Sequence, residues 1–326
     1  MLSRRSALAA TFGALLSACG RSAEDEGAAE PGLIRIAILK SVEADGDEGR
    51  WSAVFAGLQA ATGLTAKTAS PSSAAALVEA MHRRRVDLAV MSAASALGAV
   101  RRADGEVFAR LNSAAPPDTA LLVVGSRSPL TLDRILKCDR KLLLGIADGG
   151  ESVALSAADA FLFAADGIAP SHCFRSIHAA SAPAVLGDLS ARKIDLAFLE
   201  ADQASGAAAG GVRALWGSPP MPSPALVWRR DLDPAVKEKL RQYILTYGQA
   251  SAAQKQALAD LHLAGFAPAD NSHLLMEREM DAAHAWLEAK AGGDKAKADQ
   301  AKSALDELSA ERHDLEARTG APASVQ

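Results

Sequence analysis

The chain has 326 residues, a formal net charge of -4 at pH 7 and 49% hydrophobic residues. This hydrophobic content excludes global disorder and is sufficient for a sizeable core. The negative charge, without a basic stretch interleaved with aromatic residues, argues against a nucleic-acid partner. The sequence contains no G-x-S-x-G, H-E-x-x-H or Walker loop and no metal-type cysteine spacing, so it predicts no enzyme, cofactor or metal site.

The first residues predict an export signal. The pair Arg4-Arg5 precedes an apolar run, residues 7–18, that is too short to cross a bilayer as a helix. The run ends in Leu16-Ser17-Ala18-Cys19, which resembles the lipobox of bacterial lipoproteins. This resemblance implies removal of residues 1–18, acylation of Cys19 and a membrane anchor in the periplasm. An ordinary cleaved signal with a chance cysteine is the alternative.

Strands and helices are predicted to alternate after a short tether. Residues 19–32 are acidic and rich in small residues, which predicts a flexible segment. Short β-branched or apolar runs then predict strands, and apolar residues at helical spacing predict helices. The expected strands are 33–39, 64–69 and 86–91, and the expected helices are 51–62 and 73–81. Such alternation predicts α/β layers around a largely parallel sheet.

The same pattern restarts in the second half of the chain. Strands are expected at 121–124, 141–147, 173–177, 194–199 and 225–228, and helices at 132–136, 152–165, 182–192, 234–248 and 252–263. Residues 126–129 are predicted to form a first crossing between two lobes. The proline-rich segment 218–224 cannot be helix or central strand and is predicted to form the return crossing. From residue 273 onward the sequence is helical in character.

Two cysteines remain once Cys19 is assigned to lipid. An oxidising compartment would allow Cys138 and Cys173 to form a disulfide. Two separate buried thiols are an equally open interpretation, because the sequence does not give their geometry.

Three stretches together resemble the phosphonate-type periplasmic binding proteins of ABC importers, which have the type II solute-binding fold. They are Val78–Ala89, Asp148–Pro170, and Arg192–Ala197 joined to Ser218–Asp233. The resemblance implies two α/β lobes, two hinge crossings and a small-molecule ligand between the lobes, handed on to an ABC permease. The expected divisions are 33–125 with 224–270 for the first lobe, 126–223 for the second, and a helical C-terminal extension over 271–326.

The predicted phosphonate loop departs from the family pattern. The family has Asp-Pro-x-Ser-Thr-Ser-Gly at the start of its central helix, where this chain has Asp148–Ala154. Gly150, Glu151 and Ser152 are therefore candidate ligand residues, but two of the three hydroxyls are absent. Glu151 places a carboxylate where the charge of an anionic ligand would lie, which is unfavourable. Alternatively, Glu151 only caps the helix.

Other candidate ligand residues follow predicted strands or begin a helix. They are Trp51, Ser92, Ser95, Glu200 and Asp202. Glu200 and Asp202 lie just past a strand, the usual ligand-facing edge of open α/β sheets. The family's pocket histidine and pocket aromatic fall at Ala182 and Ala96, which departs further from the pattern. Together with Glu151, the two acids favour a cationic or neutral ligand over a phosphonate.

Two competing interpretations stay open. A sensory or scaffold lipoprotein derived from the binding fold would signal to a membrane partner without transport. His273, Glu277 and His284 could share one helix face and bind a metal, although a solvated helix face is the simpler interpretation.

Overall fold

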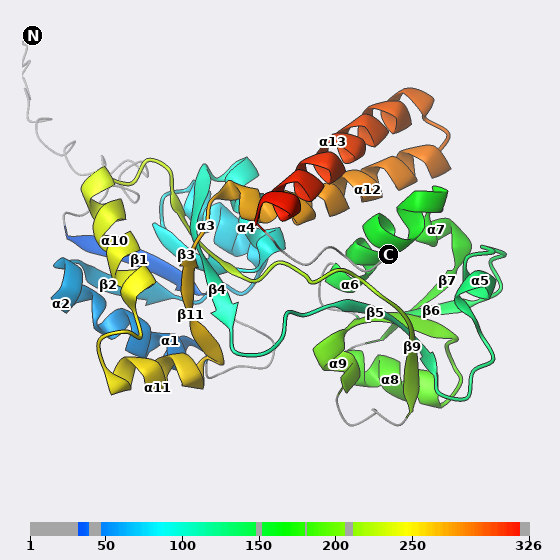
Figure 1. Cartoon of the computed structure of the whole chain (residues 1–326), viewed down its shortest axis with the longest axis horizontal. Coiled ribbons are helices and arrows are strands. Elements are labelled where there is room, and N and C mark those ends of the chain that lie inside the picture. Colours follow the sequence, from blue (N-terminus) through cyan, green and yellow to red (C-terminus); the bar gives the residue numbers. More distant parts are fainter. Residues whose placement is uncertain (1–31, 39–46, 148–151, 180, 206–210, 320–326) are drawn as a thin grey trace, which may run out of the picture.

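The computed structural model of this protein describes residues 32–38, 47–147, 152–179, 181–205 and 211–319. Within them the chain forms two β-sheets, each covered by helices, and a C-terminal helical hairpin (Figure 1). We call the six-stranded sheet with its helices lobe 1, and the five-stranded sheet with its helices lobe 2. None of the helices in these residues is long and apolar enough to cross a membrane.

Lobe 1 is built from both halves of the chain. Its strand order is β11-β4-β10-β3-β1-β2, where β1, β2 and β3 are mutually parallel and β10 is antiparallel to both of its neighbours. The strands are β1 (Leu33–Ile38), β2 (Thr65–Ala69), β3 (Leu88–Met91), β4 (Gly105–Ser113), β10 (Ala225–Arg229) and β11 (Leu263–Pro268). The helices are α1 (Asp47–Ala56), α2 (Leu58–Thr62), α3 (Ala74–His82), α4 (Ala93–Arg102), α10 (Pro234–Thr246) and α11 (Ala252–Asp260).

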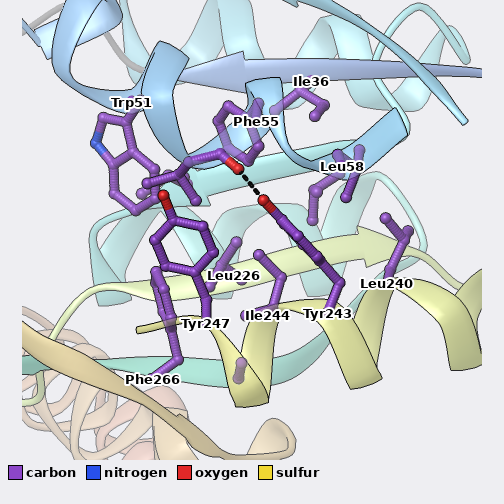
Figure 2. Packing of buried hydrophobic residues seen from close by; sticks show 14 of the residues in the cluster. Ile36, Trp51, Phe55, Leu58, Leu226, Leu240, Tyr243, Ile244, Tyr247 and Phe266 are labelled. Carbon is purple, nitrogen blue, oxygen red and sulfur yellow. Dashed lines mark hydrogen bonds between the residues drawn. The ribbon is translucent and has the colours of Figure 1, made fainter. Parts of the chain in front are cut away.

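The core of lobe 1 is rich in aromatic side chains. Trp228 is fully buried and stacks on Phe108 with ring centroids 3.9 Å apart. Figure 2 shows part of the same core, in which helix α10 packs against the first two helices. There the hydroxyl of Tyr243 donates a hydrogen bond to the carbonyl of Val54. The buried phenol is thereby satisfied, as buried polar groups generally are.

Lobe 2 contains the middle of the chain. Its strand order is β7-β6-β8-β5-β9, with β6 parallel to both β7 and β8. The strands are β5 (Ala120–Gly125), β6 (Leu143–Ala147), β7 (Arg175–Ala179), β8 (Leu196–Glu200) and β9 (Val212–Gly217). The helices are α5 (Leu132–Ile135), α6 (Val153–Ala158), α7 (Pro170–Cys173), α8 (Ala182–Ser190) and α9 (Ala201–Ser205). A π-helical turn, η1 (Asp159–Phe163), and a 3-10 turn, η2 (Ala164–Asp166), extend α6.

A disulfide staples lobe 2. It joins Cys138, which follows α5, to Cys173 at the end of α7, with Cα atoms 4.4 Å apart. Both cysteines contact the hydrophobic core of this lobe. The structure therefore brings together the two cysteines whose pairing the sequence left open.

Helix ends follow local sequence signals. Serines begin several helices by accepting a backbone N–H bond with their side chains, as Ser73 does from Ala76 and Ser181 from Ala184. Gly63 and Gly167 end α2 and η2 with positive φ angles of 75° and 61°, a conformation that glycine adopts without strain.

The first crossing between the lobes lies earlier than the sequence predicted. Strand β5 was expected in the first lobe, but it pairs with β8 and β9 in the sheet of lobe 2. Strand β4, which no sequence pattern indicated, occupies the place in lobe 1 between β10 and β11. The chain therefore crosses at residues 114–119, which include Pro116 and Pro117, and not at 126–129. The proline-rich segment 218–224 connects β9 to β10 as the return crossing.

A helical hairpin follows lobe 1. A 3-10 turn, η3 (Asn271–Leu274), leads into α12 (Leu275–Ala291), which packs along α13 (Lys295–Thr319). Figure 1 shows the hairpin lying over the region between the lobes. Met280 and Leu287 of α12 belong to the hydrophobic core of lobe 2, whereas Leu274 belongs to that of lobe 1.

Candidate functional site

A pocket of about 380 Å³ lies at one edge of the sheet of lobe 1. Strands β1 and β3 are parallel, so their carboxyl ends meet at this edge, the usual ligand position in open α/β sheets. The wall is largely apolar, with hydroxyl groups and two basic side chains. It is formed by Ile38, Arg50, Trp51, Val90, Met91, Ser92, Leu111, Ser113, Ser223, Pro224, Leu261, His262 and Leu263.

Trp51 is both a pocket residue and a core residue. Its side chain is only 5% exposed, and it stacks on Phe55 with ring centroids 5.7 Å apart. Its ring also lies 6.1 Å from that of Phe266 (Figure 2). Trp51 is thus held rigidly by the core and presents only a small part of its ring to the pocket.

The hydroxyl groups of the pocket differ in how they are used. Ser92 begins α4 and accepts a hydrogen bond from the backbone N–H of Ser95 at 3.3 Å, while the two serine hydroxyls lie 2.9 Å apart. Ser92 lines the pocket, whereas Ser95 is not part of its wall. The hydroxyl of Ser223, in the return crossing, is buried and has no hydrogen-bond partner among the described residues. An unsatisfied buried hydroxyl in a pocket wall is a natural contact for a ligand.

The ligand-facing edge of lobe 2 carries the other predicted residues. Because β6 and β8 are parallel, Ser152 after β6 and Glu200 at the end of β8 lie at the same edge of the sheet. The hydroxyl of Ser152 caps α6 by accepting from the N–H of Leu155 at 3.2 Å. Gly150 and Glu151 lie outside the described residues, as does Cys19.

Three carboxylates gather at this edge. Asp118, Glu200 and Asp202 each place an oxygen within 4.8 Å of the others. Burial, followed by the hydrogen bond and negative charge of Asp118 and the charge of Asp202, raises the pKa of Glu200 to about 7. Such a cluster is stabilised by a cation, whether a metal ion or an organic ammonium group.

Sequence reasoning found Glu200 and Asp202 but missed Asp118. Asp118 belongs to the first crossing, and its carboxylate accepts hydrogen bonds from the N–H groups of Thr119 at 2.8 Å and Ala201 at 3.1 Å. Its position beside Glu200 results from the antiparallel pairing of β5 with β8. The sequence carries no signal for that pairing, since the two strands are far apart in the chain.

The return crossing connects the acidic cluster to the pocket. The carbonyl of Asp118 accepts the N–H of Met221 at 2.8 Å. Two residues further on, Ser223 lines the pocket of lobe 1. A ligand that contacts both regions would therefore touch both crossings, where lobe motion must originate.

The sequence suggested that His273, Glu277 and His284 share one helix face. The structure does not place them on one solvated face. His273 is largely buried and lies 2.8 Å from the carbonyl of Ser223, and burial lowers its pKa. His284 faces lobe 2, where its ring nitrogen lies 2.9 Å from the carboxylate of Asp159. Glu277 is 7% exposed. The reason is that His273 lies in the 3-10 turn η3 and Glu277 in a buried part of α12, whereas the side chain of His284 stays 61% exposed.

Comparison with known proteins gives a consistent result. Residues 36–274 match the model of a family described as the phosphonate periplasmic substrate-binding protein of ABC transporters. The phosphonates-binding periplasmic protein of Escherichia coli K12 is 25% identical over 215 residues. That match covers 63% of this chain and 63% of the relative, less than two thirds of the relative's length.

Solved structures show the same fold. A binding protein component of an ABC phosphonate transporter from Pseudomonas aeruginosa has a TM-score of 0.68 and 25% identity, covering 87% of this chain and 99% of that one. PhnD1 from Prochlorococcus marinus, solved with methylphosphonate, has a TM-score of 0.58 and 15% identity, covering 77% and 97%. The overall α/β fold is therefore shared with both.

Proposed function

The chain belongs to the family of ABC-transporter phosphonate periplasmic substrate-binding proteins, and we propose that it captures a small cationic or neutral molecule, not a phosphonate, for an ABC importer. The acidic cluster of Asp118, Glu200 and Asp202 is the observation that carries this proposal. A solute-binding protein closes around its ligand by hinge motion, and these residues and the pocket both adjoin the crossings.

Charge explains the preference for a cation or a neutral molecule. A dianion bound beside this cluster would be repelled by the negative charges of Asp118 and Asp202 and by the partial charge of Glu200, whose pKa of about 7 leaves it partly protonated at neutral pH. Glu151 adds a fourth carboxylate in the loop where the family pattern has hydroxyl residues. An ammonium group would instead bind the cluster, while the apolar wall around Trp51 would cover the uncharged part of the ligand.

Export and lipid anchoring are part of the same proposal. The sequence Leu16-Ser17-Ala18-Cys19 resembles a lipobox, and acylation of Cys19 would retain the protein at the periplasmic face of the membrane, next to its permease. Mass spectrometry of the membrane-extracted protein would test this point. Acyl chains on Cys19, lost in Cys19→Ser, support the anchor, whereas an unmodified cleaved N-terminus would contradict it.

A thermal-shift screen tests the ligand. Phosphonates, phosphate, sulfonates, amino acids and polyamines would each be added to the native protein and to Glu200→Gln. A ligand at 100 times its dissociation constant adds about 2.7 kcal/mol of stability, which raises the melting temperature clearly. We expect an amine-containing compound to stabilise the native protein and to lose much of this effect in Glu200→Gln. Stabilisation by phosphonates alone would contradict the proposal.

One observation favours a second candidate, a sensory or scaffold lipoprotein. The C-terminal extension contacts the cores of both lobes, through Leu274 of η3 in lobe 1 and Met280 and Leu287 of α12 in lobe 2, which restrains the motion that transport requires. A protein of this kind would bind a membrane partner without a solute. If no compound in the screen changed the melting temperature, this second candidate would be favoured over transport.

A further inference from the structure

The C-terminal hairpin makes a third connection between the lobes, in addition to the two crossings. The family match ends at residue 274, one residue before α12 begins, so the hairpin lies beyond the matched segment. Its start is fixed to lobe 1. The side chain of Asn271 accepts the N–H of Val107 at 3.0 Å, His273 contacts the carbonyl of Ser223, and Leu274 is 1% exposed in the core.

Helix α12, which follows the turn η3 directly, is fixed to lobe 2 only a few residues later. Met280 and Leu287 are each 1% exposed within the core of lobe 2. The helix also meets lobe 2 through polar contacts: His284 binds Asp159, and Glu288 accepts the hydroxyl of Ser171 at 2.6 Å. The two buried side chains, Met280 and Leu287, together with these more exposed polar contacts, show that the hairpin is packed on lobe 2 and is not a loosely attached tail.

The second helix of the hairpin strengthens the attachment to lobe 2. Arg312 of α13 is 6% exposed and donates to Glu279, which is 4% exposed. The guanidinium of Arg312 also lies 5.5 Å from the centre of the Phe161 ring in lobe 2. Such a buried charged contact fixes orientation because its loss would leave an unpaired buried charge.

Between the two anchors, the chain is a short rigid helix. Leu274 and Met280 are six positions apart, which in an α-helix corresponds to about 9 Å. The crossings at 114–119 and 218–224, in contrast, contain no helix or strand. Near this segment, Arg101 of α4 in lobe 1 forms an ion pair with Asp281 of α12. Both side chains are about half exposed, so the pair is weak but spans the junction.

We infer that residues 275–280 form a strut that restricts the lobes to one hinge axis, and that the Arg101–Asp281 pair biases the lobe angle. Two flexible crossings alone permit both bending and twisting of one lobe against the other. A third, rigid connection removes the twist, so that the lobes can close only by bending around the strut. Closure must move α12 relative to α4, and therefore must change the ion pair.

The distance between the lobes, measured by single-molecule energy transfer or pulsed electron resonance, tests this inference. Labels would be placed on the exposed residues Gln59 in lobe 1 and Ala184 in lobe 2 through an unnatural amino acid, so that the native cysteines stay intact. Arg278 is exposed within the strut, and Arg278→Pro would remove a helix hydrogen bond and kink it. We expect a distance distribution that is roughly twofold broader. The matched control is Lys255→Pro, at an exposed site of α11 in lobe 1, which lies at the same position from the start of its helix and loses one equivalent hydrogen bond, to the carbonyl of Ser251. It should leave the distribution narrow.

The ion pair provides a second test that does not depend on a helix-breaking substitution. Arg101→Glu would place two acids together. We expect the ratio of molecules with the lobes open to molecules with the lobes closed to change by about 1.4- to 5-fold. The double variant Arg101→Glu/Asp281→Arg should restore the native distribution. The intralobe pair Arg83–Glu79 is similarly exposed, so Arg83→Glu should have no effect.

Two results would overturn the inference: distributions that are identical in the native protein, Arg278→Pro and Lys255→Pro, or a double charge reversal that does not restore the native distribution. No ligand is needed, so either outcome leaves the proposed transport function to its own test.

Discussion

The two lobes begin a central strand with the same pattern, an aliphatic residue followed by Asp-Leu-Ala. In lobe 1 the carboxylate of Asp87 accepts the backbone N–H of Arg35 at 2.9 Å, and in lobe 2 that of Asp195 accepts the N–H of Leu143 at 2.8 Å. Each aspartate lies 52 positions after its partner, on the adjacent parallel strand. The shared pattern therefore joins parallel strands at the edge away from the ligand site.

The surroundings of the two aspartates differ. Asp87 is 3% exposed and also binds the guanidinium groups of Arg35 and Arg229, at 2.8 and 3.1 Å. Asp195 is half-buried, and among the described contacts its carboxylate accepts only the hydrogen bond from the backbone N–H of Leu143. Lobe 1 thus encloses an ion network, whereas lobe 2 relies on its disulfide and the docked hairpin. One sequence pattern can occupy the same structural position and contribute very differently to stability.

The largest expected effect is on Asp87. Asp87→Ala would remove the buried carboxylate from Arg229, which is 6% exposed and would keep, among the described contacts, only its pair with Asp231, and from the half-buried Arg35. We expect a loss of about 3 kcal/mol in the free energy of unfolding. Urea denaturation followed by the fluorescence of Trp228 and its neighbours would measure it. A loss below about 1 kcal/mol would show that the arginines find other partners or water.

The disulfide ranks next. Its closed loop spans 35 positions, and opening it by Cys138→Ala/Cys173→Ala should cost about 2–4 kcal/mol. Because both cysteines belong to the core of lobe 2, hydrogen exchange should accelerate in β6 and β7 and stay unchanged in β1 and β3. Equal acceleration of hydrogen exchange in both lobes would contradict the expectation that the disulfide stabilises only lobe 2.

A smaller effect on the free energy of unfolding is expected at Glu200, which belongs to the acidic cluster at the ligand-facing edge of lobe 2. The pKa of this group is raised from its ordinary 4.5 to about 7, so the folded protein holds a proton that the unfolded chain releases. The resulting stabilisation is present below pH 4.5 and is lost as the pH rises toward 7. Because the side chain is partly solvated, we expect about 1–2 kcal/mol. Denaturation between pH 5 and 8 should show the slope in the native protein and a flatter profile in Glu200→Gln.

The smallest effect is on Asp195. Asp195→Ala removes one hydrogen bond from a half-buried group, and we expect about 1 kcal/mol. The same denaturation experiment measures it alongside Asp87→Ala. Equal losses for the two variants would show that the buried ion network around Asp87 adds nothing beyond the hydrogen bond that the two aspartates share.

Sequence reasoning predicted most elements but not their pairing. Strands with strong β-branched runs, such as Leu33–Ile38, and helices with clear serine caps, such as Ala74–His82, were expected close to their observed bounds. Strand β4 was missed because Gly105–Ser113 contains charged and polar residues and no clear alternation. Because β4 was not predicted, β5 was assigned to lobe 1, and the first crossing was expected after β5 and not before it.

The candidate site was only partly accessible from sequence. Trp51 and Ser92 were singled out as separate residues, and the structure places both in one pocket wall. Ser223, His262 and Asp118 reach the site through crossings and strand ends whose positions depend on long-range pairing. Local patterns contain no record of such pairing, so no sequence signal could have selected these residues.

Calorimetric titration with methylphosphonate and with small ammonium compounds distinguishes a cation-binding site from a phosphonate-binding site. We expect that the native protein binds an ammonium compound, that Glu200→Gln weakens this binding at least about tenfold, and that methylphosphonate binds weakly or not at all. Tight binding of methylphosphonate by the native protein, with Glu151 and the acidic cluster intact, would contradict this expectation.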